Sequence, residues 1–186
     1  MSTPAQRVPM TLHELRLLPE DGRRWELVDG DATVTPAPTT THQEVSAMLL
    51  HQLITQLKLT RLARVFHAPV DVVFDEKNVV EPDLVIVASA NSSIIVERAV
   101  EGAPDVVVEV LSPSSIARDR KLKLHLYARF GVREYWIVDP VKATLEAHRL
   151  AGDAYQLREF YDRRATLRCP DFPSLAVDLS VVFDPA

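Results

Sequence analysis

Two acidic residues stand inside apolar runs of this sequence, where a charge is costly. Residues 106–111 read VVVEVL and carry Glu109, and residues 79–87 read VVEPDLVIV and carry Asp83. Successive side chains of a strand alternate between its faces, so a run that is apolar on both faces predicts a strand covered on both sides. A dehydrated carboxylate is unfavourable unless a cation, a metal or a hydrogen-bond donor meets it. We therefore expect both acids to have partners, and to meet if their strands are neighbours.

A candidate cation lies on the helix predicted after the Glu109 strand. Counting about 100° per residue from Leu122, an arc of about 140° holds the side chains that face the core. This arc contains Leu122, Leu126, Asp119, Phe130, Lys123 and Tyr127. Lys123 is thus expected to point inward, whereas Lys121 projects toward solvent. Within the arc, Asp119, Lys123 and Tyr127 form an i, i+4, i+8 row.

Two acids on consecutive apolar strands, with an inward lysine on the following helix, match the requirements of metal-assisted phosphodiester hydrolysis. Carboxylate oxygens hold a hard divalent cation that keeps most of its waters. Such a cation activates a water and stabilises charge on the phosphorane-like transition state, while an ammonium group orients the nucleophile or neutralises charge. The alternative is structural: buried charges are commonly just paired, so Glu109 and Lys123 could form an ion pair without a catalytic role.

Length and composition favour one compact α/β domain over residues 1–186. The chain has 47% hydrophobic and 25% charged residues and a formal net charge of −5. A nucleic-acid enzyme with this charge would have to concentrate its basic residues locally. The single cysteine, Cys169, excludes an intramolecular disulfide and a cysteine-rich zinc site. No apolar run approaches the roughly 20 residues that span a bilayer, and the N-terminus lacks the pattern of a signal peptide, so we expect a soluble cytoplasmic protein.

Capping and turn signals predict the elements in the first half of the chain. Capping boxes, which satisfy two backbone donors at a helix start, begin with Thr11 and Thr41. Asp29-Gly30 between strand-like runs is typical of a hairpin. The predicted elements are a helix to about Leu18, a hairpin of residues 24–28 and 31–34, a helix to about Lys58, and one long or two short strands in residues 62–74, bent near Pro69.

The second half is predicted in the same way. Residues 88–104 show no clear period, which indicates a connector with about one helical turn. The Glu109 strand leads through a turn at residues 112–115 into the Lys123 helix, which Gly131 caps. The elements expected after it are a strand of residues 134–138, a hairpin of residues 143–150 and 154–161, a short strand near residues 166–168, and a helical turn from Ser174.

The motifs along the chain resemble those of a known family. Pro82-Asp83 followed by Glu109-Val110-Leu111 resembles the PD-(D/E)XK nuclease superfamily, whose restriction endonuclease-like fold is a mixed β-sheet flanked by helices. Over nearly the whole chain the sequence resembles more closely the Uma-two family of restriction endonucleases. This likeness is carried by residues 25–30 (WELVDG), 81–84 (EPDL), 108–114 (VEVLSPS) and 134–140 (EYWIVDP), together with Asp119, Lys123, Tyr127 and Gly131-Val132.

The resemblance implies the fold and part of the site. It implies a restriction endonuclease-like α/β (α+β) domain whose mixed sheet is flanked by helices, with an N-terminal β-hairpin and helix. It implies Asp83 and Glu109 as metal ligands, the backbone carbonyl of Val110 as a third ligand, and Mg²⁺ or Mn²⁺ as the cofactor. The superfamily's lysine belongs two residues after the glutamate, where this chain has Leu111. A helix packed on the sheet can deliver an ammonium group to the same point, so we expect Lys123 to replace it.

Four further residues have weaker interpretations. By itself, Glu26 would be interpreted as an exposed or arginine-paired acid of the first hairpin. The resemblance implies instead that Glu26 lines the site and assists catalysis. His42 is either a capping neighbour of the second helix or a general base or phosphate contact. Tyr127 either holds a charged side chain of the site by its hydroxyl or is a core tyrosine with a satisfied oxygen. Asp119 is an accessory candidate on the same helix.

Together these features predict a Mg²⁺- or Mn²⁺-dependent endonuclease that hydrolyses DNA. In this hypothesis Asp83 and Glu109 hold the metal, and Lys123 orients the water. The main rival is a non-catalytic binding or assembly protein of the same fold, whose acids form structural ion pairs; Leu111 and the negative net charge favour it. A third reading is a small metal-dependent hydrolase with a non-nucleic substrate. Restriction-type nucleases cut two strands by pairing two identical sites, so a homodimer is expected.

Overall fold

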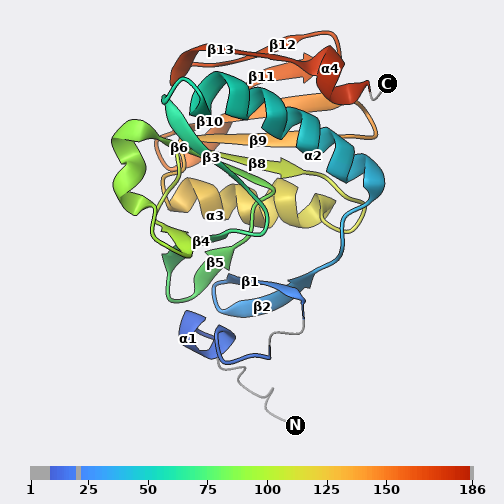
Figure 1. Ribbon diagram of the computed structural model, residues 1–186. Helices are drawn as coiled ribbons and strands as arrows, with labels where there is room; N and C mark the ends of the chain where they lie inside the picture. Colours follow the sequence, from blue (N-terminus) through green and yellow to red (C-terminus); the bar gives the residue numbers. More distant parts are fainter. Residues whose placement is uncertain (1–8, 20–21, 185–186) are drawn as a thin grey trace.

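The computed structural model describes residues 9–19 and 22–184 and contains three sheets flanked by helices (Figure 1). The central sheet is six-stranded and mixed. In spatial order its strands are β11 (Ala154–Asp162), β10 (Thr144–Ala151), β9 (Glu134–Asp139), β8 (Val106–Val110), β6 (Leu84–Ala88) and β3 (Ala63–His67). Because β8 pairs antiparallel with β6 and parallel with β9, the strand that carries Glu109 lies beside the strand that follows Asp83, which is the condition under which the two acids were expected to meet.

Helices cover both faces of this sheet. The helix α2 (Thr40–Leu53), continued by the π-helical turn η1 (Ile54–Lys58), packs on the face that holds Val106, Val108 and Val110. The π-helical segment η3 (Arg118–Lys123) runs into α3 (Leu124–Arg129), which packs on the face that holds Val107 and Leu111. Side chains of a strand alternate, so Glu109 faces the α3 side.

A second sheet packs on the other side of α3. Its five strands are β2 (Asp31–Thr35), β1 (Arg24–Val28), β5 (Asn78–Val80), β4 (Asp71–Asp75) and β7 (Ala99–Glu101), in that spatial order. The short helix α1 (Leu12–Leu15), which begins with the predicted capping box at Thr11, packs its Leu12 against Leu27 and Val79 of this sheet. The α3 helix is therefore enclosed between two sheets.

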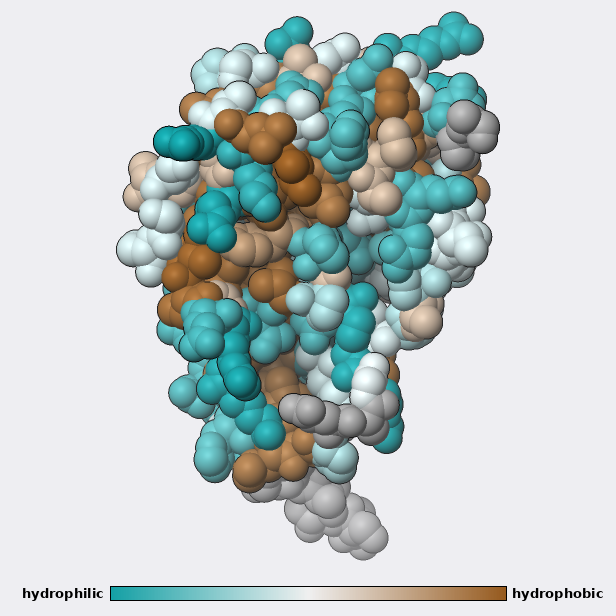
Figure 2. Space-filling model, in the orientation of Figure 1, coloured by the Kyte–Doolittle hydropathy of each residue, from teal (hydrophilic) through white to brown (hydrophobic). Residues whose placement is uncertain are grey.

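The C-terminal elements complete the core on the α2 side. They are the two-stranded sheet of β12 (Thr166–Cys169) and β13 (Phe172–Asp178) and the helix α4 (Leu179–Phe183). Figure 2 shows that apolar surface gathers over α2 and β3 on the face in view, and Leu59 and Leu62, between η1 and β3, are exposed. Within the described residues, none of the helices is long and apolar enough to span a membrane.

The structure corrects several expectations about elements. The connector at residues 88–104 contains the 3-10 helix η2 (Ser89–Ile94) and the edge strand β7, which at three residues is too short to show a period. The helical turn expected from Ser174 is wrong, because this segment pairs with β12 and the helix begins only after its cap Asp178. Thr39, not Thr41, caps α2 by accepting from the backbone N–H of His42.

The expected inward position of Leu122 is also wrong, because its side chain is 45% exposed. The arc assumed a regular α-helix, whereas residues 118–123 form a π-helix, which winds more residues into each turn. Asp119, Lys123 and Tyr127 remain buried, and Lys121 is exposed as predicted.

Candidate active site

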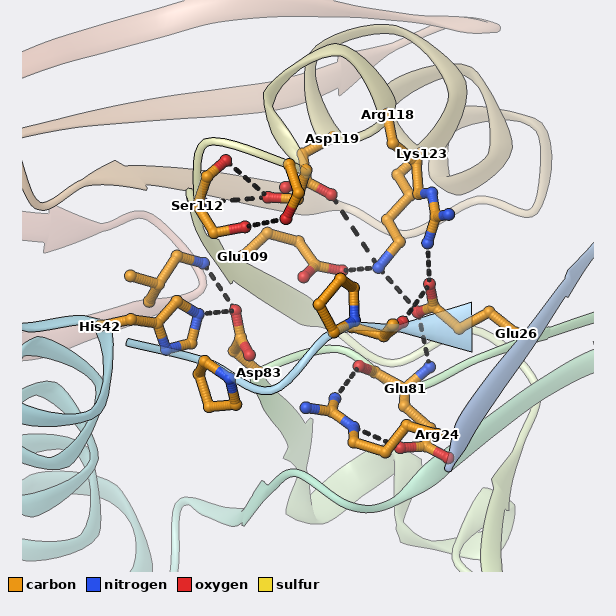
Figure 3. Close-up of a pocket in the computed structure, with 16 residues that line it drawn as sticks. Arg24, Glu26, His42, Glu81, Asp83, Glu109, Ser112, Arg118, Asp119 and Lys123 are labelled. Carbon is orange, nitrogen blue, oxygen red and sulfur yellow. Dashed lines mark hydrogen bonds and ion pairs between the residues drawn. The ribbon is translucent and has the colours of Figure 1, made fainter. Parts of the chain in front are cut away.

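A pocket opens where the two large sheets meet the starts of α2 and η3 (Figure 3). Acidic and basic side chains from segments far apart in the sequence converge on it. Its charged lining residues are Arg24, Glu26, Glu81, Asp83, Glu109, Arg118, Asp119 and Lys123, and His42 lies beside them. The pocket therefore contains the acids, the lysine and the histidine singled out in the sequence, while Tyr127 lies behind it in the core.

The pairing register explains how Asp83 and Glu109 meet. Leu84 pairs with Val108 and Val85 pairs with Val107 across β6 and β8. Continuing this register by one residue sets Asp83 opposite Glu109, and opposite side chains of paired strands lie on the same face. Figure 3 shows both carboxylates directed into the cavity.

Asp83 is held through one of its two oxygens. Its Oδ2 accepts from the backbone N–H of Val110 at 2.8 Å and lies 3.1 Å from His42 Nε2. Burial lowers the pKa of His42, but the hydrogen bond and charge of Asp83 outweigh burial, so that the pKa lies above its usual value. The other ring nitrogen of His42, Nδ1, is buried and has no hydrogen-bond partner in the described part of the chain.

Glu109 is held in the same way. Its Oε1 accepts from Lys123 Nζ at 2.8 Å and from the Tyr127 hydroxyl at 2.7 Å. Glu109 is buried, with an exposed fraction of 4%, and burial raises its pKa well above the usual value even though Lys123 opposes this effect. The protonated form of Glu109 is thus favoured relative to a carboxyl group in water.

Lys123 lies among three acids. Its Nζ donates to Glu26 at 2.7 Å as well as to Glu109, and Asp119 Oδ1 lies 4.0 Å away. Burial alone would lower the pKa of Lys123, but the charges of Glu109 and Glu26 raise it above its usual value. The side chain is therefore an ammonium group at neutral pH.

Glu26 is held by four donors. Its Oε1 accepts from Lys123 and from the backbone N–H of Glu81, and its Oε2 accepts from Arg118 and Thr35. Burial would raise the pKa of Glu26, but Lys123 and the other donors lower it below its usual value. Glu26 is therefore a fixed anion that lines the pocket and holds Lys123. It makes no hydrogen bond with Asp83.

Three charged lining residues, Arg24, Glu81 and Arg118, escaped the sequence analysis as site residues. Arg24 donates to Glu81 at 2.7 Å, and both side chains border the pocket. Strand alternation could have indicated Arg24, because it shares a face of β1 with Glu26. Arg118 lies five residues before Lys123, so on a regular α-helix the two side chains would point about 140° apart. The π-helical turn brings both to the same pocket.

The donor set fits a small divalent cation with a partly retained water shell. In the described residues no group of three or more His, Cys, Asp or Glu side chains is arranged to hold a metal. Asp83 and Glu109 supply two carboxylates. The backbone N–H of Val110 donates to Asp83, whereas that of Leu111 donates to Val138 of β9. The carbonyl of Val110 therefore lies on the same edge of β8 as its N–H, away from β9. Two carboxylates and a carbonyl suffice for Mg²⁺, which usually keeps several waters.

The fold is that of an α/β protein of known structure. It matches a crystal structure from Anabaena variabilis, titled a putative nuclease belonging to DUF820, with a TM-score of 0.79 and 24% sequence identity. The match covers 94% of this chain and 98% of the other.

The family follows from the sequence itself. The chain belongs to the Uma2 family, described as putative restriction endonuclease, whose model matches residues 12–181. This finding confirms the family and the restriction endonuclease-like fold that the motifs indicated. No curated protein matches the sequence.

Proposed function

We propose that this protein is a divalent-metal-dependent endonuclease that hydrolyses phosphodiester bonds in DNA. The observation that carries the proposal is the meeting of Asp83 and Glu109, from neighbouring strands, in one pocket with the ammonium group of Lys123. Family membership supports the nuclease class, and the apposition of Asp83 and Glu109 in the pocket supports a requirement for a cation.

In this proposal Asp83, Glu109 and the carbonyl of Val110 would hold Mg²⁺ or Mn²⁺. When bound there, such an ion lowers the pKa of a coordinated water and neutralises charge on the phosphate. The residues of the chain supply the fixed ligand geometry and a dehydrated surround, since Glu109 is almost fully buried.

Lys123 acts as a cation and not as a general base. Its raised pKa keeps it protonated, so it cannot accept a proton from water at neutral pH. An ammonium group has three N–H donors, and Lys123 uses two of them on Glu26 and Glu109. The third N–H is available to orient the attacking water or to contact a phosphate oxygen. Lys123 would thus do the work of the superfamily's lysine, whose position is occupied by Leu111 in this chain.

The competing function is a non-catalytic binding or assembly protein. The four donors to Glu26 and its ion pair with Lys123 favour it, because these contacts would persist as structural ion pairs without a metal. The two hypotheses differ in whether the apposed Asp83 and Glu109 bind a cation.

The test is calorimetric titration with Mn²⁺ followed by nicking of supercoiled plasmid. We expect the wild type to bind Mn²⁺ and cut, and Asp83→Asn and Glu109→Gln to lose both properties. Glu81→Gln is the matched control, because Glu81 lines the same pocket but pairs with Arg24. Unchanged Mn²⁺ binding in Asp83→Asn and Glu109→Gln, or no binding by the wild type, would overturn the proposal. The same assay on RNA tests the choice of DNA, and the expected homodimer and cytoplasmic location stay predictions.

A further inference from the structure

The two proposed metal ligands are held by the protein in the same unusual way. Each carboxylate receives both of its hydrogen bonds on a single oxygen, Oδ2 in Asp83 and Oε1 in Glu109. The second oxygens, Oδ1 and Oε2, have no hydrogen-bond partner among the residues that the structure describes. One oxygen of each acid is thus committed to the protein, and the other faces the pocket.

From this geometry we infer that Tyr127 and His42 are positioning residues that restrict Asp83 and Glu109 to one metal bond each and thereby favour Mg²⁺ and Mn²⁺ over Ca²⁺. The inference rests on the proposed function. Mg²⁺ requires near-ideal octahedral geometry with few protein oxygens, whereas Ca²⁺ takes 6–8 oxygens and readily accepts both oxygens of a carboxylate. A carboxylate with one oxygen already committed cannot offer both without breaking a hydrogen bond.

Tyr127 is suited to this role because its ring is packed on all sides in the core. The side chain is fully buried in α3, between the two sheets. Its ring makes edge-to-face contacts with Phe74 and Tyr135, with centroids 6.0 Å and 5.0 Å apart. Lys123, by contrast, divides its donors between Glu109 and Glu26, so Tyr127 is the donor dedicated to Glu109.

His42 is the equivalent residue for Asp83. Its ring is buried at the start of α2 and lies beside Asp83, on the side of the pocket opposite Lys123 (Figure 3). The second donor to Asp83 is the backbone N–H of Val110, which belongs to β8 and is fixed by the sheet.

A matched control for Tyr127 is present in the same core. Tyr135 is equally buried and also makes one hydroxyl hydrogen bond, but its partner is the backbone carbonyl of Asp119, at 3.1 Å. Removing either hydroxyl leaves the ring packing intact. Only the Tyr127 hydroxyl acts on a proposed metal ligand.

The experiment measures the Mn²⁺ and Ca²⁺ affinities of the wild type, Tyr127→Phe, His42→Ala and Tyr135→Phe by calorimetry. Loss of a residue that orients a metal ligand typically weakens binding by about 10–100-fold. We expect Tyr127→Phe and His42→Ala to lose Mn²⁺ affinity by about this factor and to lose less Ca²⁺ affinity, so that the ratio of the two affinities falls. Tyr135→Phe should leave both affinities unchanged.

The outcomes separate this inference from the proposed function. If the wild type binds no Mn²⁺, the proposed function fails and the inference fails with it. If the wild type binds Mn²⁺ but Tyr127→Phe keeps the wild-type ratio of Mn²⁺ to Ca²⁺ affinity, Tyr127 does not select between the metals. In that case only the inference is overturned.

Discussion

At Lys123 one ammonium group meets the carboxyl groups of Glu26, Glu109 and Asp119. Lys123 is 4% exposed, so water cannot replace these contacts if the lysine is lost. A buried ion pair contributes little net stability, but removing one partner leaves uncompensated buried charge. Lys123 therefore matters for stability as well as for the proposed chemistry.

We predict that Lys123→Met lowers the free energy of unfolding by about 3–5 kcal/mol, because it leaves Glu109 buried without its cation and leaves Glu26 with its ion pair to Arg118. Urea denaturation followed by circular dichroism measures this change. Lys121→Met is the control, since Lys121 is exposed two residues away and its loss should cost under about 0.5 kcal/mol. A Lys123→Met protein as stable as the control would show that these acids do not depend on the lysine.

Among the elements, the hairpin of β1 and β2 brings Glu26 to Lys123. Its turn residues, Asp29 and Gly30, both have positive φ, 52° and 80°, which the Asp-Gly pair tolerates. A Cβ atom on Gly30 would also collide with Pro9. The position of Glu26 thus depends on a glycine four residues away.

Gly30→Ala should destabilise the protein by about 1–3 kcal/mol, the cost of a left-handed backbone in a non-glycine residue, with the clash against Pro9 adding to it. Gly152→Ala is the control: Gly152 has a φ of 70° in the turn between β10 and β11, but a Cβ there meets nothing within 4 Å. The comparison of the two thermal midpoints isolates the clash. Equal losses would mean that the segment around Pro9 moves away freely.

The π-helical segment η3 is the second element on which the site depends. It turns Arg118, Asp119 and Lys123 toward one pocket while Leu122 points to solvent. Breaks of this kind in a helix often occur at functional sites. Here the π-helical turn is what adds Arg118 to the contacts of Glu26.

For the whole molecule, we propose that both large sheets belong to one cooperative domain, because they share a core around α3. This core joins Val28, Val72 and Val80 of the second sheet to Val107 and Tyr135 of the central sheet. A domain with a shared core unfolds as a unit.

The two tryptophans allow this to be tested, since Trp25 lies in β1 and Trp136 lies in β9. We expect single-tryptophan proteins, Trp25→Phe and Trp136→Phe, to show fluorescence transitions that coincide with the circular dichroism transition of the same protein in urea. Each remaining tryptophan then reports the unfolding of its own sheet. An earlier transition at Trp25 than in the circular dichroism signal would indicate a second sheet that unfolds separately.

The sequence by itself determined the elements whose signals are local. The capping box at Thr11, the Asp29-Gly30 turn and the apolar runs around Asp83 and Glu109 each depend on near neighbours, and the structure confirms these elements. A charge inside an apolar run demands a partner wherever it lies. This local demand was enough to single out Asp83 and Glu109.

Only the tertiary structure decided which partners meet. Lys123 bonds to Glu26, 97 residues away, and nothing in either local pattern encodes that distance. The π-helical turn that exposes Leu122 and the strand that contains Ser174 likewise depend on packing against distant elements. Local periodicity describes one face of one element. The hydrogen bonds of His42 to Asp83 and of Tyr127 to Glu109 join different elements, so they form only when those elements pack together.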